Sequence, residues 1–279
     1  MSSLTFRLAE PLGSVELIAL LDAEGAFFQS RQEAFPNAAA DDWRRADALD
    51  PQAVRAGEWW LHFRCFALQY EDGRVVLVDL GVGPSSAPSS SWAPVPGRLP
   101  DELASAGISP QAVESVVVTH MHTDHIGWVT DGVASTPLLP NARYLLQRTE
   151  IDTIERGNPA VKTWLLDPVR ATHQLRAVDG DLLLRPGVRV VATPGHTPGH
   201  QSVLLEAESS QVLITGDLLA SVVQLINPEI TYLHDMDPDQ ARQTRIATLR
   251  ELRRQTGVLL ATPHLGQAFV RLDTLSGVE

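Results

Sequence analysis

The sequence predicts an α/β protein, and three observations point to that class. Short runs of apolar, β-branched residues recur along the chain, and each run is closed by Gly, Pro or Asp. Segments with helix start and stop signals lie between several of these runs. The 279 residues are 44% apolar and 20% charged and show no tandem repeat, which is typical of a globular α/β chain. This length is generous for one such domain and short for two, so we expect a single domain over residues 1–279.

Eight of the apolar runs are expected to be strands, several of them buried on both faces. In chain order these strands are Val15–Leu21, Val75–Leu80, Val116–Thr119, Arg143–Leu146, Val188–Thr193, Val203–Leu205, Val212–Thr215 and Val258–Thr262. Helices are expected from Pro100 to Gly107, over Thr149–Arg156, and from Asp237 to Thr256. In the last helix Ile246, Leu249 and Leu252 recur every third position and share one face.

Two stretches, 22–58 and 83–97, carry few regular signals and are expected to be loop excursions. The first is polar and rich in Ala, with Phe27 and Phe28, and the second is rich in Pro and Ser, with Trp92 in its middle. Long loops often cover a functional site. The same aromatic residues could instead hold a surface excursion against the core, and the first stretch could also form the interface of a homodimer.

The charge balance and the single cysteine limit the classes of partner and compartment. Lys and Arg number 22 against 34 Asp and Glu, a net charge of −12, whereas binding to nucleic acid needs a basic face. Cys65 lies in an apolar run, cannot form an intrachain disulfide, and is expected to be a buried, inert thiol. The sequence shows no signal-peptide pattern and no run near the ~18 apolar residues of a membrane span. We therefore expect a cytoplasmic protein with neither a nucleic-acid nor a membrane partner.

Residue types that bind metals are concentrated directly after the strand Val116–Thr119. Three histidines and one aspartate, His120, His122, Asp124 and His125, fall within six positions. On an extended or tightly turning segment His120 and His122 point the same way, while the other two can face a second centre beside them. Imidazole and carboxylate are ligands of zinc and the neighbouring metals, so this segment predicts a metal site.

Three later strands also lead to a histidine or an aspartate. His196 and His200 lie in the segment Thr193–His200, where Gly and Pro favour a rigid turn. Asp217 and His264 each stand two residues past the end of a predicted strand. Because sites in α/β proteins assemble at the carboxyl ends of strands, this repetition predicts that the side chains meet at one place.

With these motifs in this order, the sequence resembles the metallo-β-lactamase superfamily. The resemblance extends from Val75–Gly81 to His264 and rests chiefly on the H-x-H-x-D-H motif of residues 120–125. It implies an αββα sandwich, the metallo-β-lactamase fold, with two divalent metal ions bound at the edges of the sheets. Zinc is the ion that the resemblance favours, and Mn, Fe or Co would also suit nitrogen and oxygen ligands.

The resemblance also implies a role for each residue. The first ion would be held by His120, His122 and His196, and the second by Asp124, His125 and His264. Asp217 would bridge the two ions, and Asp124 could also take or pass a proton, so both carboxylates would be catalytic. Asp79 and His200 would orient ligands without binding an ion themselves.

Departures from individual members narrow the implied function. Asp217 stands where the β-lactamases of this fold have Cys, and His122 stands where the di-iron electron-transfer members have Glu. Nuclease members need a basic surface, which the net charge of −12 disfavours. Thioesterases similar to glyoxalase II carry a helical domain after the last metal histidine, whereas only a short segment of this sequence follows His264. A compact hydrolase remains, similar to lactonases or to methyl-parathion hydrolase. The stretch Gly216–Gln224 followed by Asp235–Pro238 looks most like the second group, and Ala220 stands where the better-known lactonases have a substrate-holding Tyr, which disfavours a lactonase of that type.

The expected reaction is cleavage of an ester, lactone or phosphotriester bond in a small, partly apolar substrate by a hydroxide that bridges two metal ions. Two alternatives from other classes stay open. One is a mononuclear iron dioxygenase that acts on a persulfide, although the complete second ligand set argues against it. The other is a non-catalytic, metal-bound effector that senses a small ligand.

Aromatic and apolar residues near the ligands are candidates for the substrate pocket. These candidates are Trp128, Leu225, Ile226, Tyr232 and His234, with Trp92, Phe27 and Phe28 as a cover. Each of them could equally belong to the core. His62 and His173 lie in strand-like segments without a partner motif, so we expect them in the core or at the surface rather than at a metal ion.

Overall fold

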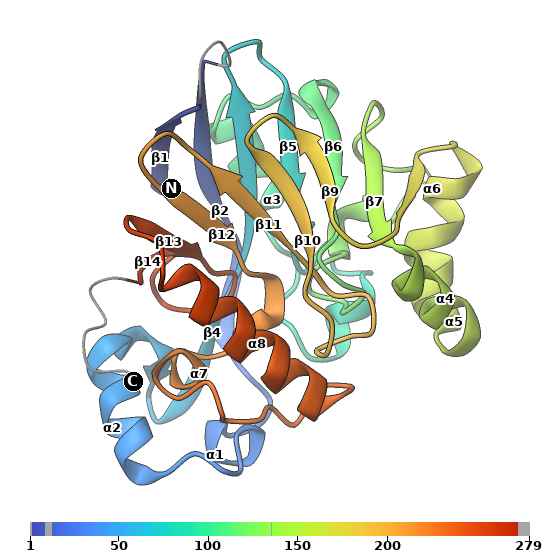
Figure 1. Ribbon diagram of the computed structural model, residues 1–279. Coiled ribbons are helices and arrows are strands. Elements are labelled where there is room, and N and C mark those ends of the chain that lie inside the picture. The colour runs from blue at the N-terminus through green and yellow to red at the C-terminus, as the bar shows by residue number, and fades with distance from the viewer. Residues whose placement is uncertain (1, 9–12, 135, 273–279) are drawn as a thin grey trace.

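The structure is a computed structural model that describes residues 2–8, 13–134 and 136–272. Two β-sheets pack face to face, and helices lie against the outer faces of the pair (Figure 1). This αββα arrangement confirms the predicted fold class.

The first sheet holds the N-terminal strands in the order β1-β2-β4-β5-β6-β7-β8, with β3 paired to β4. The bounds are β1 Ser2–Arg7, β2 Ser14–Ala26, β3 Val54–Arg55, β4 Glu58–Tyr70, β5 Val75–Val78, β6 Val113–Val117, β7 Arg143–Gln147 and β8 Leu175–Val178. Strands β5 to β8 are parallel neighbours. All four residues of β5 are buried, as expected for a parallel strand that is covered on both faces.

The second sheet has the order β14-β13-β12-β11-β10-β9. Its strands are β9 Leu182–Arg185, β10 Val188–Ala192, β11 Gln201–Glu206, β12 Gln211–Ile214, β13 Val258–Ala261 and β14 Phe269–Arg271. Strands β12 and β13 pair in parallel, and the other pairs are antiparallel.

The helices differ in which sheet they cover. Their bounds are α1 Arg31–Ala34, α2 Ala40–Leu49, α3 Leu99–Ser105, α4 Arg148–Gly157, α5 Pro159–Val161, α6 Asp167–Ala171, α7 Val222–Ile226 and α8 Pro238–Leu252. Helices α3 to α6 contribute to an apolar cluster on the outer face of the first sheet. Helices α2, α7 and α8 contribute to a cluster with the outer face of the second sheet. A third cluster lies between the sheets, where Phe66, Val76 and Val117 meet Val190 and Val203.

Each of the eight predicted strands overlaps an observed strand, although their ends differ, and three helices lie where helices were expected. The last helix, α8, ends at Leu252 and not at Thr256. There the hydrogen bonds become those of tight turns, such as Arg254 N–H to the Glu251 carbonyl at 3.1 Å. At its start Pro238 occupies the first turn, and the Asp237 side chain accepts the Gln240 N–H at 2.9 Å.

The expectation of a loop over residues 22–58 is wrong, because this stretch contains the end of β2, helices α1 and α2, and strand β3. The N-cap residue of helix α2, Ala39, has no capping side chain, although Asp42 accepts the Ala39 N–H at 2.9 Å, and the helix buries Trp43 and Ala46. It packs on α7, and this tertiary contact is not revealed by local signals. The stretch 83–97 is irregular apart from a 3-10 turn at Pro88–Ser91.

Among the residues that the structure describes, none of the helices combines the length and the apolar character that crossing a membrane requires. The two sheets share one interior cluster, and we therefore propose that the chain is one domain. That proposal covers residues 1–279, of which 1, 9–12, 135 and 273–279 lie outside the described residues.

Candidate metal centre

The residues predicted to bind or to orient the metal ions follow five strands of both sheets that end close together. Asp79 follows β5, His120 follows β6, His196 follows β10, Asp217 follows β12, and His264 follows β13. The structure therefore brings together side chains that are up to 185 positions apart in the sequence — position 79 and position 264 — as strand-end placement predicts.

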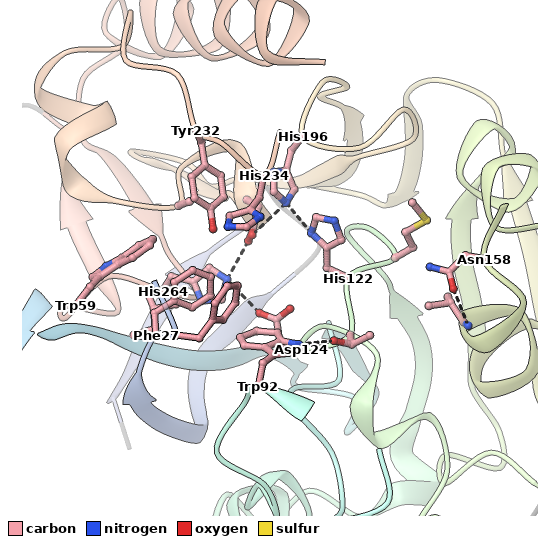
Figure 2. A pocket seen from close by; sticks show the side chains of 17 residues that line it. Phe27, Trp59, Trp92, His122, Asp124, Asn158, His196, Tyr232, His234 and His264 are labelled. Carbon is pink, nitrogen blue, oxygen red and sulfur yellow. Dashed lines mark hydrogen bonds and ion pairs between the residues drawn. The ribbon is translucent and has the colours of Figure 1, made fainter. Parts of the chain in front are cut away.

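The candidate ligands form two adjoining groups. Donor atoms of His120, His122, His196 and Asp217 lie within 4.8 Å of one another, and so do donor atoms of Asp124, His125 and His264. Asp217 joins the groups, because Oδ2 lies 3.3 Å from His196 Nε2 and Oδ1 lies 3.1 Å from His264 Nε2. Figure 2 shows His122 and Asp124, which share the loop after β6, converging with His196 and His264 from other loops. The seven residues thus have the arrangement that two neighbouring ions with a bridging carboxylate would need.

Hydrogen bonds on Nδ1 orient four of the histidines. His125 Nδ1 donates to Asp79 at 2.8 Å, and His196 Nδ1 donates to Asp235 at 2.9 Å. His264 Nδ1 donates to the His62 carbonyl at 2.9 Å. His120 Nδ1 lies 3.0 Å from the Thr119 hydroxyl. Since Nδ1 is occupied, each ring turns Nε2 toward the cluster, as is usual when a second residue positions a metal-binding histidine.

Unsatisfied buried atoms indicate that the centre is built for cations. His120 Nε2 is buried and has no hydrogen-bond partner among the described residues. His122 Nδ1 and His196 Nε2 lie 2.9 Å apart, so two imidazole nitrogens face each other. Such an arrangement is costly unless a proton or a metal ion lies between the groups. Imidazole nitrogens with carboxylate oxygens form a donor set that suits zinc and its neighbours.

The titration of the histidines also reflects the negative charge of the carboxylates. Burial alone would lower the pKa of His196, but hydrogen bonds to Asp217 and Asp235 and their charges raise it to about 9. Burial and the neighbouring His196 lower the pKa of His122 to about 3. Protons would therefore bind at only part of the cluster, and divalent ions would displace them.

Asp79 is linked to both groups of ligands. Its Oδ2 accepts from His125 directly, and the Thr119 hydroxyl donates to the same oxygen at 2.8 Å. Because that hydroxyl has one proton, it accepts from His120 Nδ1 at 3.0 Å, which leaves His120 Nε2 unprotonated. Asp79 also has a left-handed backbone with φ +64°, a conformation that non-glycine residues adopt at strained functional positions.

Replacing Asp79 with alanine is expected to weaken metal binding by about 10–100-fold, because both His125 and His120 lose the group that orients them. Metal affinity should be measured by competition with a chromophoric chelator. Asp101→Ala on the exposed side of α3 is the matched control. An unchanged affinity in folded Asp79→Ala would show that the residue is only structural.

The other histidines considered above lie outside the two groups of candidate ligands. His200 Nε2 accepts the Asp217 N–H at 2.9 Å, so this side chain supports a candidate ligand. His62 is buried in β4 with Nε2 3.2 Å from Glu24. The sequence suggested a strand-like segment at His173, but this residue lies in a turn with φ +58°. Cys65 is buried and free, as expected, and burial raises the pKa of its thiol.

A cavity of about 300 Å³ opens above the candidate ligands. Of the predicted contacts and covers, Phe27, Phe28, Trp92, Tyr232 and His234 line it. The predicted contacts Trp128, Leu225 and Ile226 do not. Trp128 packs with the outer cluster of the first sheet and donates its indole N–H to Asp22 at 2.9 Å, while Leu225 and Ile226 are buried in α7 within the cluster of the second sheet.

Several lining and supporting residues escaped the sequence analysis. Trp59, Leu61, Asn158 and Val161 also line the cavity. Asp235 supports His196, and a buried Glu150 lies under the ligand loops. No local pattern marks these residues, because each reaches the site only through tertiary packing, although the proximity of Asp235 to Tyr232 and His234 in the sequence is a weak signal.

The sequence of this chain matches a known protein family. The family model for the metallo-beta-lactamase superfamily matches residues 64–264. An N-acyl homoserine lactonase of a Bacillus species is 31% identical over 168 residues, which are 55% of this chain and 62% of that protein. The N-acyl homoserine lactonase AttM of Rhizobium radiobacter is 27% identical over 41% of this chain and 44% of that protein. The matched part therefore spans less than two thirds of the length of these curated relatives.

Solved structures show the same fold at low sequence identity. The hydrolase AbOPH of the beta-lactamase superfamily superposes with a TM-score of 0.75 at 22% identity, over 97% of this chain and 94% of the other. AidC, a dizinc quorum-quenching lactonase, superposes with a TM-score of 0.74 at 20% identity, over 96% and 92% of the two chains.

Proposed function

The chain belongs to the metallo-β-lactamase superfamily, and on that premise we propose that it is a two-metal hydrolase whose substrates are small lactones. The observation that carries this proposal is the pair of ligand groups joined by Asp217 at the floor of an aromatic-lined cavity. The names of the relatives, N-acyl homoserine lactonases, support the lactone. Zinc is the ion we propose, since the ligands suit it and AidC is a dizinc enzyme.

In this proposal His120, His122 and His196 hold one ion, Asp124, His125 and His264 hold the other, and Asp217 bridges them. When bound, the ions would lower the pKa of a coordinated water toward neutrality and stabilise negative charge on the oxygen under attack. Asp124 lines the cavity, and Figure 2 shows its carboxylate directed toward His264. Asp124 is therefore placed to take a proton from the water and to pass it to the leaving oxygen.

Tyr232 is proposed to hydrogen-bond the substrate. Its ring is 7% exposed and is stacked on Phe35 at 4.9 Å and parallel to the His196 ring at 6.0 Å. Tyr232 lines the cavity, and its hydroxyl points into it in Figure 2. Burial and the charges of Asp217 and Asp124 raise its pKa, so the hydroxyl stays protonated and can donate to a substrate oxygen.

Tyr232→Phe is expected to lower kcat/KM for a lactone by about 10-fold, the size of one neutral hydrogen bond, without changing metal content. The matched control is Tyr144→Phe, because the Tyr144 side chain is also buried but belongs to the outer cluster of the first sheet. Equal kcat/KM in Tyr232→Phe and the wild type would remove this contact from the proposal.

The aromatic side of the cavity supports a substrate with an apolar group. The Phe27 ring lies 4.8 Å from Trp59 and 5.7 Å from Trp92, and the Trp92 indole N–H donates to Thr123 beside the ligands at 3.0 Å. These rings can hold an acyl chain and exclude water from the reacting bond. They would also hold an aryl leaving group, so aryl esters and phosphotriesters are the second candidate substrates.

A hydrolysis panel on metal-replete protein tests the substrate class. An acyl-homoserine lactone of medium chain length, a simple γ-lactone, an aryl ester and a phosphotriester would be compared by kcat/KM. We expect the acyl-homoserine lactone to dominate. Dominance of the aryl ester or the phosphotriester would move the function to the second candidate, and no turnover of any substrate would contradict the hydrolase.

A further inference from the structure

The least expected charged group near the centre is the buried carboxylate of Glu150. This residue lies in the first turn of α4 and is 1% exposed. Oε1 accepts the Met121 N–H at 2.7 Å and the Thr197 hydroxyl at 2.9 Å. Oε2 accepts the Gly199 N–H at 2.8 Å. Both carboxylate oxygens are therefore used, and all three donors are neutral.

These three donors belong to the two loops that carry the first group of candidate ligands. Met121 lies between His120 and His122 in the loop after β6 of the first sheet. Thr197 directly follows His196 in the turn between β10 and β11 of the second sheet, and Gly199 lies two residues further. Glu150 thus ties together two loops that come from different sheets.

The backbone of Gly199 approaches Glu150 closely, so the contact between the turn and helix α4 depends on the residue at position 199. A Cβ atom placed on Gly199 would lie 2.5 Å from the Glu150 backbone nitrogen and 2.5 Å from Glu150 Cβ. Real Cβ atoms do not approach this closely, so only glycine at position 199 lets the start of α4 rest on the turn. The helix, and with it the carboxylate, is held against the loop at van der Waals distance.

The carboxylate also carries charge in an apolar place. Burial raises the pKa of Glu150, and the hydrogen bonds from Thr197, Gly199 and Met121, together with the charge of nearby His196, oppose that shift. A buried carboxylate that meets only neutral donors is costly unless positive charge lies nearby. The proposed ions beside His120 and His196 would supply that charge, and the carboxylate would favour them in return.

We propose that Glu150 is a positioning residue for the first metal ion: it fixes the spacing between the His120/His122 loop and the His196 turn, and its negative charge strengthens binding of a divalent cation there. This inference rests on the proposed metal centre and adds a residue outside the ligand set. It predicts that loss of Glu150 affects one ion more than the other.

The test is a titration of metal-free protein with Co²⁺ in competition with a chromophoric chelator, which resolves two affinities. Glu150→Gln keeps the size of the side chain but removes the charge and one accepting oxygen. We expect one of the two Co²⁺ affinities to fall by about 10–100-fold and the other to change far less. Glu155→Gln on the same helix is the matched control, because Glu155 pairs with Arg170 at the surface, and it should leave both affinities unchanged.

A second variant separates geometry from charge and guards against misfolding. Thr197→Val removes one hydrogen bond to Glu150 and leaves the carboxylate in place, so we expect a smaller loss at the same ion. Circular dichroism should show native secondary structure for both variants. Two unchanged affinities in Glu150→Gln, or an equal fall in both, would overturn the inference while leaving the proposed function intact. A wild-type protein that binds no Co²⁺ would refute the metal centre itself and the inference with it.

Discussion

Replacing Asp217 with asparagine is expected to lower kcat for lactone hydrolysis by about 10³-fold, with loss of at least one metal ion. The carboxylate is the group shared by both sets of candidate ligands, with Oδ1 3.2 Å from His125 Nε2 and Oδ2 3.3 Å from His196 Nε2. Asparagine offers one neutral oxygen in place of two charged ones, so it cannot bridge two ions. The magnitude follows from the loss of a preorganised electrostatic contact at the reacting bond.

The measurement is kcat together with the metal content of the purified variants. Asp239→Asn on the exposed face of α8 is the control and should behave as the wild type. His196→Ala should resemble Asp217→Asn, because it removes a ligand from the same centre. Full activity of Asp217→Asn or of His196→Ala would contradict the two-metal arrangement.

Removal of the metal ions is expected to lower the melting temperature by about 10 °C. Five histidines and two aspartates would then remain packed together with imidazole nitrogens 2.9 Å and 3.3 Å apart. An ion at a thousand times its Kd stabilises the fold by about 4 kcal/mol, and each kcal/mol shifts the melting temperature of a domain near this size by about 2–4 °C. The shift of about 10 °C in melting temperature corresponds to the loss of one tightly bound ion.

Thermal denaturation in the presence and absence of a chelator measures this effect. Adding Zn²⁺ back should restore the melting temperature, and Asp217→Asn should gain less from the added metal than the wild type. A melting temperature that does not respond to the chelator or to Zn²⁺ would contradict a metal centre built into the fold.

The candidate ligands could be found in the sequence because each stands in a local pattern. His120, His196, Asp217 and His264 each follow a short apolar run, and such runs become buried strands whatever the rest of the chain does. Their common place at the carboxyl ends of strands then brings distant positions together. Asp79 and His200 stand out only through the family resemblance. The hydrogen bond of Asp79 with His125, and that of His200 with the Asp217 N–H, are consistent with supporting roles.

The walls of the cavity could not be found in the same way. Trp128 is close to the ligands in the sequence, but its ring turns to Asp22 and the outer cluster of the first sheet. Trp59 lies far from the motifs in the sequence, yet β4 carries it to the cavity. Whether an aromatic residue faces a cavity or a core depends on which elements pack against it, and that information is not local.

The supporting carboxylates show the same limit. Asp235 and Glu150 stand in segments of ordinary polar composition, and only the folded chain brings them to His196, Thr197 and Gly199. Helix α2 shows a related limit, because its N-cap residue Ala39 has no capping side chain and the helix packs on α7, which is distant in the sequence.

Lactone hydrolysis measured as a function of bound metal is the most direct test of the two-metal hydrolase. Metal-free protein would be titrated with Zn²⁺, and both the ions bound and the rate of lactone opening would be followed. The proposal predicts a rate that reaches its maximum only when two ions are bound per chain. Full activity with a single bound ion would contradict it, and two bound ions without turnover would identify a metal-bound protein that does not catalyse this reaction.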